Sequence, residues 1–415
     1  MTTAEAVLRG NDRGGYSVPT DRLYPFQWNW DSAFVAMGFC RFDPARAWSE
    51  IEFLLRGQWE DGLIPQIVFH SPSDDYFPGP DVWGIDRRPP TSGITQPPVL
   101  ATAARRVLDA APDAAAQDRM AAIFPRLRDN HRWWARARDP LGTGLVTTLH
   151  PWETGMDNSP AWDAALDRVP TTTATTIRRR DTTHVDPAFR PRAIDYQRFI
   201  HLVEVFRGAG WDPARMLAAS PFRVTDVGTN AILLRAERDL LALAARFGSA
   251  DERAEIEARI GRMAPALETL WDDRLGFYLS RDQVAGTAIP VRCSAGFLPL
   301  FAGTAPRAAS LAETLATWGK AVRFLVPSTD PGHALFEPLR YWRGPVWAVV
   351  NWMIADGLRN NGQDALARRV EADTRALIAA QGFSEYFDPT TGQGIGGATF
   401  SWTAAIALLL REDAA

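Results

Sequence analysis

The stretch "PVWAVVNWMIADGLRNNGQDALARRVEADTRALIAAQG", residues 345–382, decides the fold because it sets two helices of different character end to end. Residues 345–356 are apolar on nearly every side, which predicts a helix that is buried all round. Residues 363–380 carry a charged face and an apolar face, which predicts a half-exposed helix. The alternation of buried and half-exposed helices fits an inner ring of helices inside an outer ring.

The same alternation extends over the whole chain. Residues 400–410 are again apolar nearly all round, whereas 250–270 are amphipathic. Helices are expected at 32–59 (two helices, broken near Pro44), 97–111, 118–138, 195–210, 229–248, 250–273, 308–321, 345–362, 363–382 and 400–413. Strand signals are scarce and short, as at 63–69 and 321–327. The sequence therefore predicts an all-α fold.

The 415 residues contain no Gly/Ser linker, low-complexity tract or break in composition, so one domain over residues 1–415 is expected. Most connections between helices are short. Two long insertions, at about 60–96 and 140–194, are rich in Pro, Gly, Asp and aromatic residues. Loops of that length are uncommon unless they have a function.

Charge and composition argue against several classes of partner. The formal net charge is −4, and apart from Arg178–Arg180 there is no basic run, so nucleic acid is not expected as a partner. No apolar run resembles a signal peptide or a membrane span, and only two cysteines occur, which predicts a cytoplasmic protein that does not bind membranes. The sequence leaves open whether the chain forms a homo-oligomer.

Motifs for common cofactors are absent from the sequence. There is no GxGxxG after a strand, no P-loop, no GxSxG elbow, and the six histidines show neither HExxH nor HxH spacing. We therefore expect no metal and no other cofactor. His150, beside an acidic segment, is expected to be hydrogen-bonded within its loop.

Tryptophan is unusually frequent, with 16 copies that cluster at 28 and 30, 133 and 134, and 342 and 347. The segment "HPWETGMDNSPAWD", residues 150–163, mixes three carboxylates with two tryptophans, Gly and Pro. Tryptophan belongs to cores, but its flat face also stacks on sugar rings. Clustered aromatic side chains beside carboxylates indicate a carbohydrate site.

Three acidic segments have both a functional and a purely structural explanation. Asp31 follows Trp28 and Trp30 and is either a helix-capping acid or an acceptor for sugar hydroxyls. The second segment contains Glu153, Asp157 and Asp163, which either form turns or supply an acid.

The third acidic residue, Glu385, lies between Phe383, Ser384 and Tyr386 and is either a helix-end acid or a catalytic group. Two distant carboxyl groups in aromatic surroundings suit glycoside hydrolysis. Apolar neighbours raise the pKa of one carboxyl so that it can donate a proton, while the other stays ionised. A separation of roughly 5 Å gives retention, and about 6.5–9.5 Å gives inversion. From the residues alone, Glu153 and Asp157 remain equal candidates for the acid.

Several motifs occur in a fixed order and together resemble glycoside hydrolase family 63, most closely its compact bacterial branch of mannosylglycerate and glucosylglycerate hydrolases. They are "YPFQWNWDSAF" (24–34), "EDGLIPQIVFH" (60–70), "SGITQPP" (92–98), "HPWETGMDNSP" (150–160), "RRRDTTHVDP" (178–187), "RYWRGPVW" (340–347), "GFSEYFDP" (382–389) and "GGATFSWTAA" (396–405). The resemblance implies one (α/α)6 barrel, or toroid, whose long loops cover a central pocket, inverting chemistry and no required metal.

The resemblance also implies roles for single residues. The acid before Asn in the second acidic segment is the general acid, here Asp157, and the glutamate ahead of F-S-W is the general base, here Glu385. Glu153 becomes a supporting acid that orients its loop. The sugar subsite is expected to contain Tyr24, Trp28, Trp30, Asp31 and Gln96, with Trp342 and Trp347 as aromatic walls. An indole at Trp347 is equally consistent with a place in the core.

The implied substrate is a 2-O-α-glucosyl- or mannosyl-D-glycerate, so the aglycone subsite needs a cation. Arg190 suits a carboxylate because its fork donates two parallel bonds, although a loop arginine is often only solvated. Tyr76, Tyr196 and Tyr341 match the remaining donors. Loops 70–90 and 165–190 are expected to close over substrate. The alternatives are a neutral α-glucoside or trehalose-like substrate, or a sugar-binding protein without activity.

Overall fold

The computed structural model describes residues 2–21, 23–183, 185–303 and 306–410, and within them the protein is mostly helical. The α-helices are α1 Ala4–Gly10, α2 Asn29–Phe39, α3 Pro44–Arg56, α4 Pro80–Trp83, α5 Leu100–Ala110, α6 Ala114–Arg138, α7 Asp163–Leu166, α8 Ala193–Gly208, α9 Pro213–Ala219, α10 Val227–Phe247, α11 Ala250–Glu268, α12 Ala308–Ala321, α13 Ala348–Asn360, α14 Asp364–Gln381 and α15 Ser401–Leu409. Short 3-10 helices are η1 Pro151–Thr154, η2 Pro160–Trp162, η3 Pro187–Phe189, η4 Ser294–Leu300 and η5 Tyr341–Arg343.

Every β-strand in the described residues is only two residues long. They are β1 Gln27–Trp28, β2 Ile67–Val68, β3 Val224–Thr225, β4 Trp271–Asp272, β5 Phe277–Tyr278, β6 Arg281–Asp282, β7 Thr287–Ala288, β8 Tyr386–Phe387 and β9 Gly394–Ile395. They pair antiparallel as β1–β2, β3–β6–β7, β4–β5 and β8–β9. The run at 63–69 thus contains β2, whereas 321–327 forms no strand because α12 extends to Ala321.

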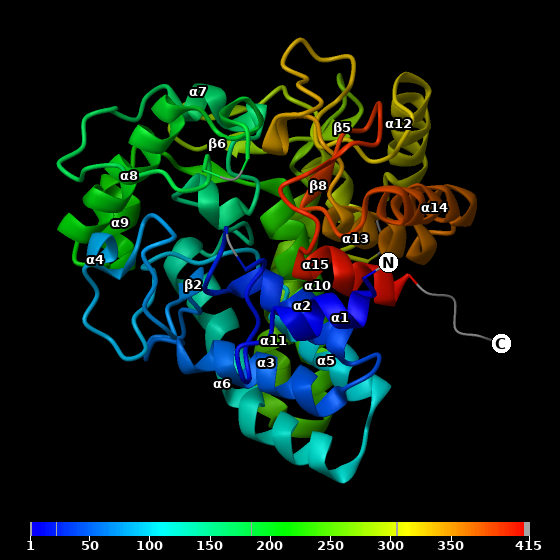
Figure 1. The fold of residues 1–415 in the computed structure, drawn as a ribbon. Helices are drawn as coiled ribbons and strands as arrows, with labels where there is room; N and C mark the ends of the chain where they lie inside the picture. The colour runs from blue at the N-terminus through cyan, green and yellow to red at the C-terminus, as the bar shows by residue number, and fades with distance from the viewer. Residues whose placement is uncertain (1, 22, 184, 304–305, 411–415) are drawn as a thin grey trace.

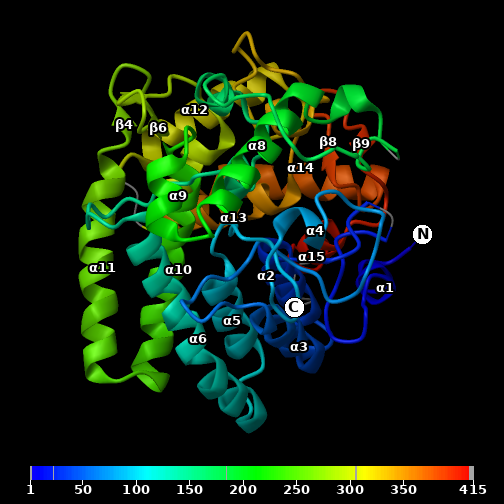
Figure 2. The ribbon, with the colours of Figure 1, turned by 90° about the vertical axis from the view of Figure 1, so that its left-hand side faces the viewer.

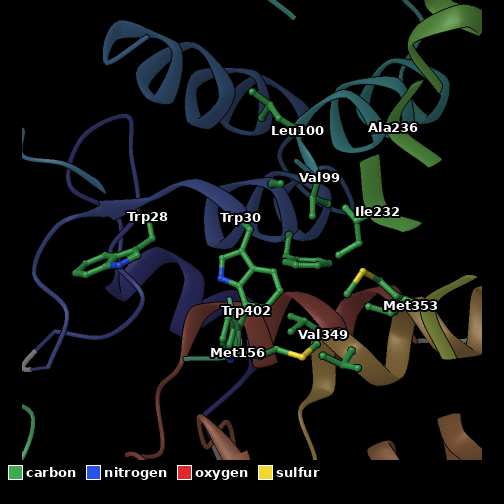
Figure 3. Packing of buried hydrophobic residues seen from close by; sticks show 14 of the residues in the cluster. Trp28, Trp30, Val99, Leu100, Met156, Ile232, Ala236, Val349, Met353 and Trp402 are labelled. Carbon is green, nitrogen blue, oxygen red and sulfur yellow. The ribbon is translucent and has the colours of Figure 1, made fainter. Parts of the chain in front are cut away.

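One set of helices is covered on all sides. α2 packs against α5 and α15, α10 packs against α5 and η4, and α13 packs against η4 and α15. Every residue of α2 is buried, as are nearly all of α13 and α15, which confirms that the apolar helices at 345–356 and 400–410 are interior. Figure 3 shows side chains of these helices meeting, with Trp30 of α2 beside Trp402 of α15, and Val349 and Met353 of α13 nearby.

A second set of helices covers the first. α3 packs on α2, α6 on α5 and α10, α11 on α10, α14 on α13, and α1 on α15. Figure 2 shows α10 and α11 side by side at one edge of the molecule. The amphipathic patterns at 250–270 and 363–380 are confirmed as the partly exposed α11 and α14.

Helix boundaries follow local chemistry that periodicity does not fully reveal. The two helices predicted at 32–59 are α2 and α3, with Pro44 at the first position of α3 and Asp43 accepting from the Arg46 N–H. α6 begins at Ala114, four residues before the predicted start, because Asp113 caps it. α1 and α9 had no prediction, and residues 411–413 of the predicted last helix lie outside the described residues.

The segments 60–96 and 140–194 contain only short elements: β2, α4, η1, η2, α7, η3 and the start of α8. Figure 1 shows the segments around α4, α7, α8 and α9 gathered on one side of the molecule, with α12 and α14 on the other. No helix in the described residues is both long and apolar enough to cross a membrane.

Candidate active site

A pocket of about 540 Å³ lies at the N-terminal ends of inner helices. Its walls come from the start of α2 and α15, from the segments that lead into α5 and α13, and from both long insertions. The lining residues are Pro19, Tyr24, Trp28, Trp30, Asp31, Gln66, Tyr76, Gln96, Trp152, Gly155, Asp157, Arg190, Tyr196, Tyr341, Trp342, Glu385, Phe400 and Trp402. Helix N-termini present positive dipole ends, which suit a site with several carboxylates.

All the predicted site residues except Trp347 line this pocket. The Trp347 ring stacks on the Trp342 ring with centroids 3.7 Å apart and planes 3° apart. Its indole N–H donates to the Tyr341 carbonyl at 3.2 Å. The structure thus corrects the expected second wall: Trp342 forms the wall, and Trp347 lies behind it as a core residue.

The loop that carries Asp157 is fixed on both sides of this residue. Gly155 has a φ of +70°, and a Cβ there would lie 2.8 Å from the Trp30 ring, so only glycine lets the loop rest on that wall. After Asp157, the Asn158 side chain accepts the Trp342 N–H at 3.0 Å. Asp157 therefore projects into the pocket from a rigid support.

Two residues of the same loop are structural, as expected. His150 accepts the Trp152 N–H through Nδ1 at 3.0 Å and donates from Nε2 to the Phe199 carbonyl at 3.0 Å. Burial lowers the pKa of His150 to about 3, which keeps the ring neutral. Glu153 is fully buried and accepts from Arg138 at 2.6 Å and from the Leu149 N–H at 2.7 Å.

Asp157 is partly exposed to the pocket, and its side chain makes no hydrogen bond to another described residue. The pKa of Asp157 is raised to about 7, chiefly by burial; Arg190 opposes this rise, and the negative charges of Glu385 and Asp181 add to it. A carboxyl group with that pKa is about half protonated in neutral solution, so a large share of the molecules can use it as an acid.

Glu385 faces the same pocket and is held by several donors. Tyr24 donates to Oε1 at 3.0 Å, and Arg190 donates from Nη1 to Oε2 at 3.1 Å. Burial raises the pKa of Glu385, against the lowering effect of Arg190 and the hydrogen bonds. Fixed donors on both oxygens of one carboxylate favour its ionised, proton-accepting form over a protonated one.

Gly396 explains the run of small residues in "GQGIGGAT". The β8–β9 register pairs Tyr386 with Ile395, so Gly396 stands opposite Glu385. A Cβ at Gly396 would overlap the Glu385 carboxylate, and its φ is +85°. A side chain larger than hydrogen is therefore excluded beside this carboxylate.

Arg190 is 2 % exposed, so it is not the solvated loop arginine that the sequence also allowed. Besides Glu385, it donates to the Tyr24 hydroxyl and to Asp181, and its guanidinium lies 4.0 Å from the centre of the Tyr341 ring. A guanidinium has five N–H donors, so two remain for a ligand.

Sequence reasoning missed several lining residues. The side-chain carbonyl oxygen of Gln66 is buried and has no hydrogen-bond partner. Trp152, Phe400 and Trp402 add aromatic surface. All four lie within or beside the motifs quoted above, but their neighbours gave no reason to choose them over core residues. Asp31 was chosen correctly as a pocket residue, and burial raises its pKa well above the usual range.

The family model for the mannosylglycerate hydrolase MGH1-like glycoside hydrolase domain matches residues 24–403. The chain belongs to this family. It is thus a glycoside hydrolase, and the resemblance to family 63 is confirmed. Among the described residues, no group of three or more His, Cys, Asp or Glu side chains is placed to hold a metal ion.

Family members similar to this chain include two curated enzymes. Mannosylglycerate hydrolase of Thermus thermophilus is 54% identical over 98% of this chain and 99% of its own. Glucosylglycerate hydrolase of Mycolicibacterium hassiacum is 34% identical over 98% and 96%. The crystal structure of a Thermus thermophilus family 63 mannosylglycerate hydrolase in complex with Tris and D-glycerate matches with a TM-score of 0.95, 54% identity and 98% coverage of both chains.

Proposed function

We propose that this chain is an inverting α-glycosidase that cleaves 2-O-α-glucosyl- or mannosyl-D-glycerate into free sugar and glycerate. The observation that carries the proposal is the placement of Asp157 and Glu385 at one pocket, where Glu385 is held by donors from Tyr24 and Arg190 while the Asp157 side chain has no such donor among the described residues. The names of the two relatives support glycerate as the aglycone.

In this mechanism Asp157 protonates the glycosidic oxygen as the bond to the aglycone breaks. Glu385 takes a proton from a water molecule that attacks the anomeric carbon on the opposite face. Tyr24 and Arg190 each donate a hydrogen bond to one oxygen of Glu385, so that the carboxylate keeps a fixed orientation in the pocket. The indoles of Trp28, Trp30 and Trp342 would contact the sugar ring, with Asp31 and Gln96 on its hydroxyl groups.

The aglycone side of the site would be formed by Arg190 with Tyr76, Tyr196 and Tyr341. The two free donors of Arg190 suit a carboxylate, which accepts parallel bonds from a guanidinium fork. The buried position of Arg190 supports this role, because a desolvated cation binds an anion more strongly than a solvated one.

The proposal also covers the fold of the chain and its location in the cell. We propose a single (α/α)6 barrel over residues 1–415, supported by the order in which α2, α5, α10, η4, α13 and α15 pack on their neighbours. A cytoplasmic location is supported by the two cysteines, Cys40 and Cys293, which are both free thiols.

The decisive experiment follows hydrolysis of both glycosylglycerates by NMR. We expect the β-anomer of the sugar to appear first, because inversion of an α-glycoside gives that anomer. Asp157→Asn and Glu385→Gln should each lower kcat by at least about 100-fold, the usual contribution of a general acid or base. Release of the α-anomer first, or near-normal rates in either variant, would contradict the assignment.

The matched substrate 2-O-α-glucosylglycerol, which lacks only the carboxylate, separates the alternatives. Loss of a charged hydrogen-bond partner should lower kcat/KM by about 10-fold to 100-fold relative to glucosylglycerate. Equal rates on the two substrates would favour the neutral α-glucosidase. Tight binding of both without hydrolysis would favour a sugar-binding protein.

A further inference from the structure

Asp181 lies next to the active site without lining the pocket. It belongs to the motif "RRRDTTHVDP", in the long segment between α7 and α8, and is 6% exposed. Its carboxylate accepts hydrogen bonds from two arginines: from Nε of Arg179 at 3.0 Å and from Nε of Arg190 at 3.4 Å. A second nitrogen of Arg179 donates to the other oxygen.

Arg179 fixes the far side of Asp181. It donates to the Pro191 carbonyl at 2.7 Å, and its guanidinium lies 4.1 Å from the centre of the Tyr196 ring. Although burial acts to raise the pKa of Asp181, its hydrogen bond to Arg179 and the charges of both arginines leave that pKa below its usual range. Asp181 therefore stays ionised and is not a proton carrier.

The contact with Nε decides where the rest of Arg190 points. A guanidinium is planar and rigid, so fixing Nε and the plane also fixes both terminal nitrogens. In the structure these nitrogens point at Oε2 of Glu385 and at the Tyr24 hydroxyl. Without Asp181, the guanidinium would keep its stacking on the Tyr341 ring but would have hydrogen bonds only to Glu385 and Tyr24, the groups that it is supposed to orient.

We propose that Asp181 is the positioning residue for Arg190: it anchors the guanidinium by its Nε edge, so that the terminal nitrogens hold Glu385 and face the aglycone. Asp181 acts through Arg190 and touches no substrate. The inference rests on the proposed function, because it takes Glu385 as the base and the aglycone as an anion.

The test compares Asp181→Ala with Glu204→Ala on both glycosylglycerates. Glu204 is the matched control, since it is a carboxylate that holds the same segment through the Ala174 and Thr175 N–H groups but contacts neither Arg190 nor Glu385. Loss of a charged partner should lower kcat/KM about 10-fold to 100-fold in Asp181→Ala, and less than threefold in the control.

Chemical rescue separates positioning from general support of the fold. Formate can enter the space left by the missing carboxylate and bind Arg179 and Arg190. Added formate should therefore raise the activity of Asp181→Ala at least fivefold and leave that of Glu204→Ala unchanged. Wild-type activity in Asp181→Ala, or an equal response to formate in both variants, would overturn the proposal.

Asp181→Asn keeps the shape of the side chain and covers the case in which the alanine variant fails to fold. The charged or titratable groups that act on Asp157 or Glu385 are Tyr24, Asp31, Tyr76, Asp181, Arg190, Tyr341 and Tyr386. Removing the negative charge of Asp181 should lower the pKa of Asp157, which moves the alkaline limb of kcat/KM to lower pH. An unchanged limb together with unchanged kcat/KM would refute the role of Asp181. A wild-type enzyme that cleaves no glycosylglycerate would instead refute the proposed function.

Discussion

Asp157 illustrates, at the scale of one residue, a conflict between activity and stability. The role of general acid proposed for Asp157 needs a raised pKa, and burial is the main cause of the raised pKa of this carboxyl. The folded state then holds a proton that the unfolded chain releases above a pH of about 3.8. The free energy of unfolding therefore falls as pH rises between these two pKa values and does not recover above about 7.

We therefore expect Asp157→Asn to be more stable than the wild type at pH 8, by on the order of 1–3 kcal/mol, because asparagine cannot ionise. Near pH 4 the two proteins should differ much less, since the pH is then close to the pKa of about 3.8 in the unfolded chain and little free energy is gained by releasing the proton. Urea unfolding at the two pH values measures this difference. A gain in stability that is the same at both pH values would contradict the raised pKa.

Gly396 is the second residue whose effect is local. Gly396→Ala should lower kcat at least about 100-fold, because displacing a catalytic group by about 1 Å can cost that much. Gly397→Ala is the control, since Gly397 also has a positive φ of +97° but no atom within 4 Å of its Cβ position. Both variants share the backbone strain, so equal loss of kcat would show that strain, rather than the Glu385 contact, is responsible.

At the scale of elements, one buried ion pair joins the end of α6 to η1 in the loop before Asp157. Arg138 is 1% and Glu153 0% exposed, and their side chains meet at 2.6 Å. Breaking a buried pair leaves an uncompensated charge, which is far more costly than losing an exposed pair. The ion pair thereby ties the C-terminal end of α6 to the loop that carries Asp157 and fixes the position of this loop at the pocket.

Glu153→Ala should therefore lower the free energy of unfolding by about 3–5 kcal/mol. The comparison is Asp167→Ala, which breaks a pair with Arg198 in which Asp167 is 70% exposed, and should cost at most about 1 kcal/mol. Urea unfolding of both variants measures the two values. Equal small losses would mean that Arg138 finds another partner or water.

At the scale of the whole molecule, helices supply a rigid frame and the long segments complete the pocket. The first long segment, residues 60–96, contributes Gln66, Tyr76 and Gln96 to the pocket. The second, residues 140–194, contributes Asp157 and Arg190. Ligand contacts therefore bridge two segments that also meet directly, where the ring centroids of Trp83 and Trp152 lie 6.3 Å apart.

Saturating D-glycerate together with glucose should slow amide hydrogen exchange in residues 70–90 and 165–190. Ligand contacts to Tyr76 and Arg190 would stabilise the closed arrangement of those loops. The outer helix α14, which contributes no residue to the pocket, is the internal control and should exchange unchanged. Identical exchange in the loops with and without ligand would contradict closure.

The sequence by itself determined the long helices and their burial, because periodicity of apolar residues depends only on local helix geometry, but it did not reveal the short helices α1 and α9. It also determined the family, and through the resemblance it proposed the two catalytic acids, since the motifs around Asp157 and Glu385 are contiguous. Within those motifs the choice of Asp157 over Glu153 came from the resemblance. The structure supplies the physical contrast: Glu153 is tied to Arg138, whereas Asp157 faces the pocket with no partner among the described side chains.

Only the tertiary structure decided which side chains lie side by side across the fold. Arg190 and Glu385 are 195 positions apart, and nothing local indicates that one holds the other. The sequence could not place Trp347 behind Trp342, because which of the two indoles faces the pocket depends on how the chain between them folds back. Proton affinity likewise depends on burial and on distant charges, which exist only once the helices have packed.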